Sequence, residues 1–250
     1  MIRTHAPALL LFLAVVVLWE AAVRIWSIPM YLLPSPLVVV GRVWAERALL
    51  WTDLSTTMIS AVLGFCLGLL VASGLGVLFT YSRTAERALL PWAVIIRTVP
   101  IVALAPLLTI WMGFGLAPKI AIAGIASFFP MLINIHRGLV AISREVAELL
   151  RLIDAGRLQS LVHVRMFAAL PYAFAGMKAS SGIAVVGAIV AEFTGANRGI
   201  GTLIVTAGYQ QDAPMLFAGI LVSSLATVLF YYVIVAVERA CLFWPDARIQ

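Results

Sequence analysis

Long apolar runs separated by short polar segments make up most of this sequence. A helix of about 20 predominantly apolar residues is long enough to cross the hydrocarbon core of a bilayer. On this criterion the pattern predicts six spans, at about residues 7–26, 56–81, 92–112, 118–136, 172–194 and 213–237. We therefore expect an all-α protein, a polytopic bundle of transmembrane helices that forms one domain over residues 1–250.

Prolines and glycines divide this apolar pattern. Pro34 and Pro36 end the first span, because proline inside a helix removes a hydrogen bond and clashes with the preceding turn. The segment after them mixes apolar and charged residues and is expected to form a short amphipathic helix on the membrane surface. In the third span, Pro100, Pro106 and Gly113 are expected to break the helix, either as plain kinks or where irregular backbone lines a pathway.

The longest polar segment, residues 143–171, lies between the fourth and fifth spans. Its first part suits a short helix with one apolar and one charged face. The D-A-G sequence at 154–156 is expected to break this helix, with Gly156 in a left-handed conformation, before a second short helix follows. Pro171 then suits the first turn of the next span. Two short helices with a sharp turn form either a knob that a soluble partner binds or a loop on the lipid surface.

Composition and charge fit a protein whose main solvent is lipid. Only 11% of the residues are charged, against about 25% in a typical soluble domain. The net charge of +6 comes largely from arginines, which we attribute to loops that orient a membrane protein and not to nucleic-acid binding. If the N-terminus is cytoplasmic, most arginines fall on the inner side. Both termini and the loop at about 137–171 are then predicted to be cytoplasmic.

Two ionisable residues lie close to predicted spans, where charges are rare and usually face a bundle interior or a cavity. Arg97 and Glu192, together with Pro100, are therefore candidates for a translocation pathway, in which Arg97 would attract an anionic solute. The alternative places both charges at span ends. Arg97 would then extend its charged group towards the interface, and Glu192 would pair with Arg198.

The sequence carries no pattern for catalysis or metal binding. It has no G-x-S-x-G elbow, no H-E-x-x-H motif, and no His, Cys, Asp and Glu cluster at metal-ligand spacing. A nucleotide-binding P-loop needs Gly-Lys-Ser/Thr, and neither Lys119 nor Lys178 has that context. We expect a chain that is not an enzyme and has no cofactor of its own. If ATP drives it, ATP and Mg²⁺ are expected on a separate ATPase subunit.

Several motifs resemble those of one family of membrane permeases. Residues 148–167 resemble the EAA loop of binding-protein-dependent ABC importers in a degenerate form: Glu148 keeps the glutamate, Leu149 and Leu150 replace two alanines, and Asp154 takes the glycine position. Similarity to the branch that imports nitrate, sulfonates, taurine and similar small solutes extends from about residue 30 to 245. It includes L-P-S-P at 33–36, R-T-V-P-I-V-A-L-A-P at 97–106, F-F-P-M-L-I-N at 128–134, A-A-L-P-Y at 168–172, A-I-V-A-E-F at 188–193, R-G-I-G at 198–201 and E-R-x4-W at 238–244.

The resemblance implies a type I ABC importer permease in the inner membrane of a bacterium. Two copies of the chain would form a homodimer in membrane lipid, with ATP-binding cassette ATPase subunits on the cytoplasmic side and an external solute-binding protein. By resemblance, the residues that couple the permease to the ATPase are Glu145, Glu148, Leu149, Asp154, Ala155, Gly156 and Arg157.

The resemblance leaves the solute open. Thiamine-precursor pyrimidines and riboflavin-like compounds are alternatives to a solute that resembles nitrate, sulfonate or taurine. An ion-coupled carrier that works alone is the rival class, which usually has more spans and inverted repeats. No internal repeat is visible in this sequence.

Overall fold

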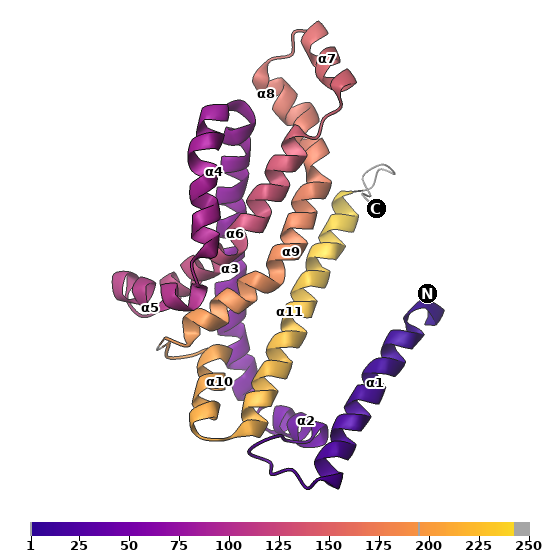
Figure 1. Cartoon of the computed structure of the whole chain (residues 1–250), viewed down its shortest axis with the longest axis vertical. Coiled ribbons are helices and arrows are strands. Elements are labelled where there is room, and N and C mark those ends of the chain that lie inside the picture. The colour runs from indigo at the N-terminus through magenta and orange to yellow at the C-terminus, as the bar shows by residue number, and fades with distance from the viewer. Residues whose placement is uncertain (1, 195, 243–250) are drawn as a thin grey trace.

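The computed structural model describes residues 2–194 and 196–242, with backbone alone at residues 2–6, 8 and 9. All regular elements in this part of the chain are helices (Figure 1). They are α1 (Ile2–Ile25), α2 (Pro36–Ala45), α3 (Arg47–Tyr81), α4 (Arg83–Thr98), α5 (Ile101–Met112), α6 (Leu116–Val140), α7 (Arg144–Leu152), α8 (Arg157–Ser160), the π-helix η1 (Leu161–Arg165), α9 (Met166–Glu192), α10 (Ile200–Tyr209) and α11 (Ala213–Cys241).

Four helical segments of the described chain are long and apolar enough to cross a membrane. They are α3, α6, α11 and the continuous run Arg157–Glu192 that contains α8, η1 and α9. Helices α4 and α5 together make a fifth candidate. Helix α1 covers the first predicted span, although part of its side chains lies outside the described residues. The motif at 238–244 also ends beyond them.

The third predicted span, at 92–112, is broken as expected, and its first helix begins earlier, at Arg83. Helices α4 and α5 meet at 101°, with the break at Val99 and Pro100. Proline disfavours a helical conformation in the residue before it, and Val99 is accordingly extended at φ −70° and ψ 126°. Pro106 lies inside α5, whereas Gly113 ends that helix with φ 77°. Of the three expected breakers, Pro100 and Gly113 therefore interrupt the helix.

The second span begins earlier than predicted. The amphipathic segment forms α2 but ends at Ala45, and α3 starts two residues later at Arg47. Asp53, which bounded the predicted span, lies inside α3 and is only 8% exposed. Its carboxylate accepts a hydrogen bond from the Gly199 N–H at 3.3 Å, so the helix accommodates a buried acid there.

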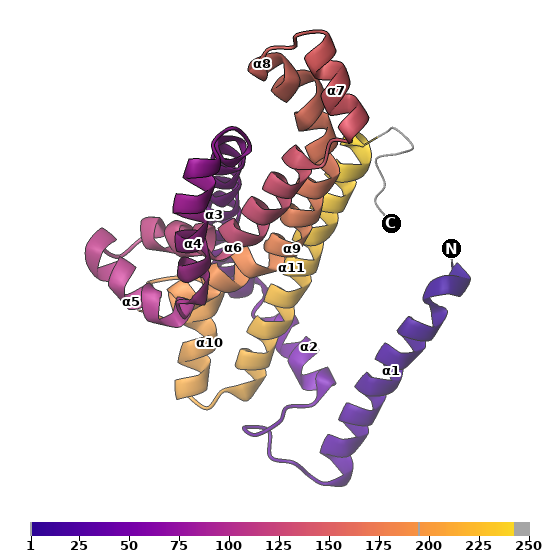
Figure 2. The ribbon, with the colours of Figure 1, turned by 45° about the horizontal axis from the view of Figure 1, so that its top comes forward.

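Helix α6 lies between α3 and α9 and forms the centre of the bundle (Figures 1 and 2). Small residues allow these backbones to approach closely, as is common where helices pack in lipid. A Cβ added at Gly64 of α3 would lie 2.5 Å from the Ala123 Cβ of α6. A Cβ added at Gly138 of α6 would lie 2.8 Å from the Ala169 Cα of α9. Packing within one chain therefore explains these glycines.

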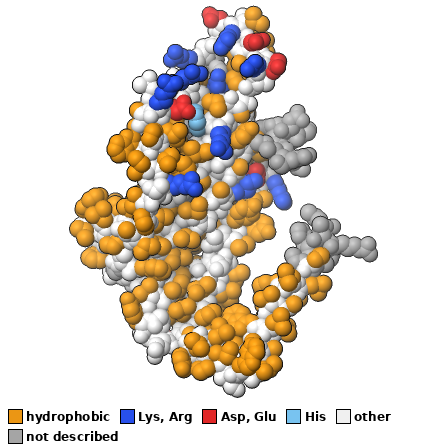
Figure 3. Space-filling view, in the orientation of Figure 1, with side chains coloured by type: hydrophobic (Ala, Val, Ile, Leu, Met, Phe, Trp, Pro, Cys, Tyr) orange, Lys and Arg blue, Asp and Glu red, His pale blue; other side chains and the backbone are white. Residues whose placement is uncertain are grey.

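The remaining helices surround this centre. Helix α11 packs on α9, α10 and α2, while α1 stands apart from the bundle in both ribbon views (Figures 1 and 2). The face seen in Figure 3 is mostly hydrophobic, and its Lys and Arg side chains gather towards the end that carries α7 and α8. We call this the loop end, and we call the opposite end, beside α10, the α10 end. An apolar belt with a charged end fits a chain embedded in lipid.

Candidate coupling and translocation sites

Helix α7 projects from the loop end beyond the top of α4 (Figures 1 and 2). Ser143 caps it, because its hydroxyl accepts a hydrogen bond from the Val146 N–H at 3.3 Å. A hydrogen bond from the Ser143 hydroxyl, helped by the Glu145 backbone N–H, lowers the pKa of the Glu145 carboxyl below its usual value. The first turn of α7 therefore holds a negative charge, which suits the positive end of the helix dipole.

The predicted break at 154–156 is confirmed, but its left-handed residue is Asp154 and not Gly156. The Asp154 N–H donates to the Arg151 carbonyl and the Ala155 N–H to the Leu150 carbonyl, at 3.1 and 2.9 Å. These are the two bonds of a Schellman motif, which places the left-handed residue at Asp154, with φ 51°. Gly156, with φ −60°, instead begins α8, and its N–H donates to the Gln159 side-chain oxygen at 3.0 Å.

Several large apolar side chains around this turn are exposed instead of packing into the bundle. Leu152 is 84% exposed and Leu158 is 73% exposed, and Leu149 and Ile153 are exposed as well. No residue of α7 is buried. We call residues 143–160 the knob. Because it extends beyond the bundle end (Figure 2), the knob holds these apolar side chains away from the bundle, and exposed apolar patches often mark interaction sites.

Three connections join the knob to the bundle. The Tyr81 hydroxyl, at the end of α3, donates to the Arg157 carbonyl at 2.8 Å. Arg165, which follows the knob, donates from its guanidinium to the Ser160 hydroxyl of the knob at 3.3 Å and to the Leu139 carbonyl of α6 at 2.8 Å. Finally, α8 continues through η1 into α9 without a break. Pro171 is therefore inside a continuous helix, and its predicted place in a first turn is wrong.

A buried polar cluster lies at the α10 end. Glu192 is 1% exposed and accepts hydrogen bonds from Lys119 Nζ at 3.1 Å, the Thr57 hydroxyl at 2.9 Å and the Gly201 N–H at 2.8 Å. Lys119 also donates to the Arg198 carbonyl at 2.6 Å. The predicted Glu192–Arg198 ion pair is therefore wrong: the Arg198 side chain is exposed, and the buried Lys119 occupies that role.

This cluster holds the beginning of α10. Three successive backbone N–H groups, of Gly199, Ile200 and Gly201, donate to the side chains of Asp53, Thr57 and Glu192. Such groups lack partners inside their own helix, so side chains of α3 and α9 satisfy them. Gly199 has φ 136°, and a Cβ there would overlap the Glu192 carboxylate. Only glycine suits this position.

Sequence reasoning found Glu192 but missed Asp53, Thr57 and Lys119. Asp53 lies just before the span predicted at 56–81 and Lys119 lies at the start of the span predicted at 118–136, where a charge usually marks the end of an apolar run. One pattern in the sequence could have indicated the Lys119–Glu192 pair: an acid and a lysine lie near the ends of different predicted spans, and buried charges need partners. However, the sequence alone does not show which span ends lie next to each other.

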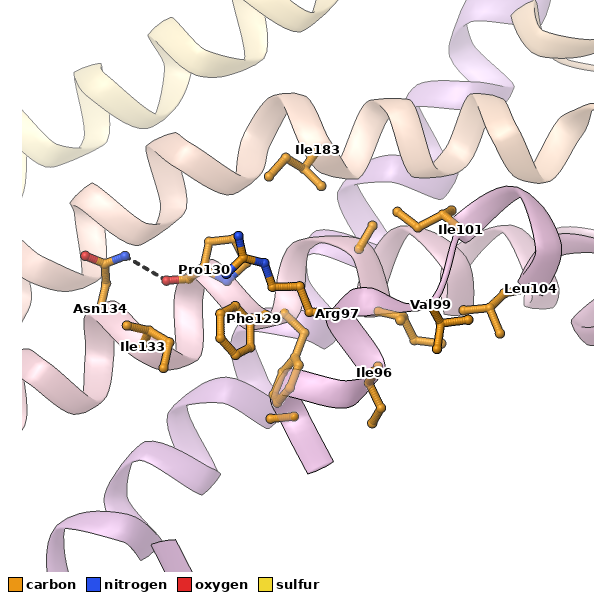
Figure 4. A pocket seen from close by; sticks show the side chains of 14 residues that line it. Ile96, Arg97, Val99, Ile101, Leu104, Phe129, Pro130, Ile133, Asn134 and Ile183 are labelled. Carbon is orange, nitrogen blue, oxygen red and sulfur yellow. Dashed lines mark hydrogen bonds between the residues drawn. The ribbon is translucent and has the colours of Figure 1, made fainter. Parts of the chain in front are cut away.

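Arg97 lies elsewhere, beside a cavity of about 360 Å³ at the break between α4 and α5 (Figure 4). Its guanidinium carbon is 5.0 Å from the centre of the Phe129 ring, a cation–π contact. Residues of α6 and Ile183 of α9 complete the walls. Val99 and Ile101 line the cavity on either side of Pro100, which does not. The structure thus separates Glu192 from Arg97.

These features define a class of protein: a helical membrane subunit with an exposed knob at one end. The chain belongs to the family described as binding-protein-dependent transport system inner membrane component, whose sequence model matches residues 64–242. Members are permease subunits of ABC importers and have no ATPase site of their own. The predicted family is therefore confirmed, and the chain is a multi-pass protein of a bacterial inner membrane.

Several relatives are similar along nearly their whole length. The riboflavin transport system permease protein RibX of Chloroflexus aurantiacus is 35% identical, over 97% of this chain and 92% of its own. The formylaminopyrimidine transport permease protein ThiX of Halalkalibacterium halodurans is 33% identical, over 94% of each. The putative aliphatic sulfonates transport permease protein SsuC of Bacillus subtilis is 30% identical, over 96% of this chain and 87% of its own.

A solved structure confirms the fold. A chain from an inward-facing crystal structure of the MetNI methionine ABC transporter superposes with a TM-score of 0.62 at 21% sequence identity. The match covers 79% of this chain and 96% of that one. The predicted all-α fold of ABC importer permeases is therefore correct.

Proposed function

We propose that two copies of this chain form the membrane pathway of an ATP-driven importer. The loop end faces the cytoplasm, where each knob binds one ATP-binding cassette subunit, and the α10 end faces an external solute-binding protein. Both termini are cytoplasmic in this arrangement, and ATP and Mg²⁺ bind to the partner ATPase. The exposed knob is the observation that carries the proposal, because Leu149, Leu152 and Leu158 are largely exposed there.

Within the knob, the contact with the ATPase is made by Glu145, Glu148, Leu149, Asp154, Ala155, Gly156 and Arg157. The apolar side chains enter a groove of the partner, and the charged residues at its edge fix the orientation. The Schellman turn holds the two short helices at a fixed angle, so the knob is preorganised for binding.

Closure of the two ATPase subunits on ATP brings the two knobs together. Displacement of a knob reaches α3 through the Tyr81–Arg157 hydrogen bond and α6 through the Arg165–Leu139 hydrogen bond. It reaches α9 through the continuous helix. These are the three helices that form the bundle centre, so they tilt as one unit. Tilting of both copies opens the pathway alternately to each side, as rigid-body switching does in other two-state proteins.

The solute is a small polar molecule that passes the cavity beside Arg97. An unneutralised guanidinium favours an anionic group, as a nitrate-, sulfonate- or taurine-like solute would supply. A thiamine-precursor pyrimidine or a riboflavin-like compound is the second candidate. Permeases named for riboflavin and formylaminopyrimidine transport, at 35% and 33% identity, support this second candidate, and a permease named for aliphatic sulfonates, at 30%, supports the first.

New positive charges in the knob test the coupling role. Glu148→Lys and Gly156→Arg are expected to abolish ATP-dependent uptake and co-purification of the ATPase, while the permease stays in the membrane at normal amounts. Glu46→Lys, at the junction of α2 and α3, is the matched control and should retain both. Uptake at the wild-type rate in both knob variants would refute the coupling role. Uptake that follows an ion gradient without an ATPase would support the rival carrier class.

A further inference from the structure

We propose that the cavity beside Arg97 accepts solutes that combine one flat apolar ring with a single anionic group. This inference rests on the proposed function, because it names the solute class of that translocation site. It excludes bare inorganic oxyanions such as nitrate as the preferred cargo. The argument starts from the one charged side chain in the cavity wall.

Arg97 has no carboxylate within ion-pair distance among the described residues. Its contact with Phe129 holds the guanidinium in place by a cation–π attraction and leaves the positive charge unneutralised. A guanidinium carries five N–H donors in a planar fork that matches a carboxylate or sulfonate. The cavity therefore offers a positioned site for one anionic group.

The rest of the wall is apolar. Branched aliphatic side chains dominate it, contributed by Ile96, Ile101, Leu104, Ile125, Ile133 and Ile183. Asn134 is the one uncharged polar side chain, and its amide N–H donates to the Pro130 carbonyl at 2.8 Å (Figure 4). A small oxyanion would gain only the hydrogen bonds of Arg97 there, whereas a solute with an apolar ring would also bury apolar surface against these walls.

A ring fits both the size and the chemistry of the space. The volume of about 360 Å³ lies within the range of about 300–1,000 Å³ that is usual for small-molecule sites. Phe128 adds a second aromatic side chain to the wall besides Phe129, and aromatic rings pack against one another edge-on or offset. In Figure 4 the Arg97 side chain extends along the cavity towards Pro130, with Ile183 across from it. A ring along the walls would thus bring its acidic substituent to Arg97.

Binding of matched probes tests this solute class. Equilibrium dialysis with the complete permease–ATPase complex in nanodiscs would compare radiolabelled benzenesulfonate with methanesulfonate, which has the same charged group without a ring, and with nitrate. We expect benzenesulfonate to bind at least tenfold more tightly than either. Arg97→Gln should weaken it at least tenfold, and Arg97→Lys, which keeps the charge but not the planar fork, should weaken it less. Equal binding of the three probes, or unchanged binding in Arg97→Gln, would overturn the proposal.

Protection of a cysteine shows where the probe binds. In a background with Cys66→Ala and Cys241→Ala, which removes two exposed thiols, Ile133→Cys would place one thiol in the wall of the cavity. Benzenesulfonate should slow its reaction with a water-soluble thiosulfonate reagent several-fold. Reaction with a lipid-soluble reagent alone would assign the cavity to lipid and would contradict the proposal.

An incorrect assignment of the solute class can be distinguished from an incorrect assignment of the protein's function. If the complex still assembles and its knob variants still lose ATP-dependent uptake, the chain remains an ATP-driven permease with a different solute site. If the knob variants retain uptake, the coupling scheme itself is wrong, whatever binds beside Arg97.

Discussion

Lys119 and Glu192 form a buried ion pair, with Nζ and Oε1 3.1 Å apart, although 73 positions separate them in the sequence. The pair joins the start of α6 to the end of α9, and both side chains are at most 6% exposed. Removing one partner of such a pair leaves an uncompensated buried charge. The integrity of the α10 end therefore depends on both residues.

Removal of Lys119 should destabilise the folded chain strongly. Lys119→Met leaves Glu192 without its cationic partner, which costs roughly 3–5 kcal/mol for a buried pair. A large fall in the apparent melting temperature of the purified protein, followed by tryptophan fluorescence, is the expected result. Lys178→Met is the matched control, because the Lys178–Glu238 pair is partly exposed. A melting temperature of Lys119→Met as close to the wild-type value as that of Lys178→Met would show that the buried pair does not stabilise the bundle.

Gly199→Ala should disrupt the α10 end even though the change adds a single methyl group. The backbone at Gly199 has φ 136°, and the new Cβ would overlap the Glu192 carboxylate. We expect a marked loss of folded protein in size-exclusion chromatography. Gly74→Ala, in the exposed part of α3, has open space for its Cβ and should be neutral or slightly stabilising. Normal yield of Gly199→Ala would contradict the geometry of this turn.

The two residues of the knob turn should respond in opposite ways to substitution. Asp154→Val puts a β-branched residue at φ 51°, at a cost of about 1–2 kcal/mol, and should weaken ATPase binding. Asp154→Gly should preserve it, because glycine adopts this conformation without strain. Gly156→Ala should also be tolerated, since its φ is −60°. Surface plasmon resonance with the purified ATPase would measure all three, and loss of binding in Gly156→Ala alone would reverse the assignment.

Tyr81→Phe should weaken coupling without weakening assembly. The change removes the hydrogen bond from the hydroxyl to the Arg157 carbonyl, worth about 1 kcal/mol, and leaves the knob surface intact. We expect ATPase binding to be unchanged and uptake per ATP hydrolysed to fall about two- to fivefold. Tyr232→Phe, on an exposed face of α11, is the control. A normal ratio of uptake to hydrolysis in Tyr81→Phe would exclude this connection from force transmission.

The sequence predicted the helical class and most spans because apolar length is a local property. It failed where a distant partner decided the outcome. Asp53 bounds an apolar run when read alone, yet it continues α3 because the Gly199 N–H satisfies it. Similarly, Glu192 was assigned to Arg198, six positions away, because nothing local shows that Lys119 starts a neighbouring helix.

The knob turn shows the same limit at shorter range. The D-A-G sequence correctly predicted a break, since both glycine and aspartate favour turns. The position of the left-handed residue depends on where α7 ends. The last hydrogen bonds of α7 place that residue at Asp154. The cavity beside Arg97 could not be predicted at all, because it depends on the 101° angle between α4 and α5.

The run Arg157–Glu192 is 36 residues long and reaches from the knob to the buried cluster. At 1.5 Å per residue a straight α-helix of this length would span about 54 Å, and this run also contains the π-helix η1 and bends along α9 (Figure 1). In the proposed importer, one unbroken stretch of helical backbone would therefore link the ATPase side to the solute side.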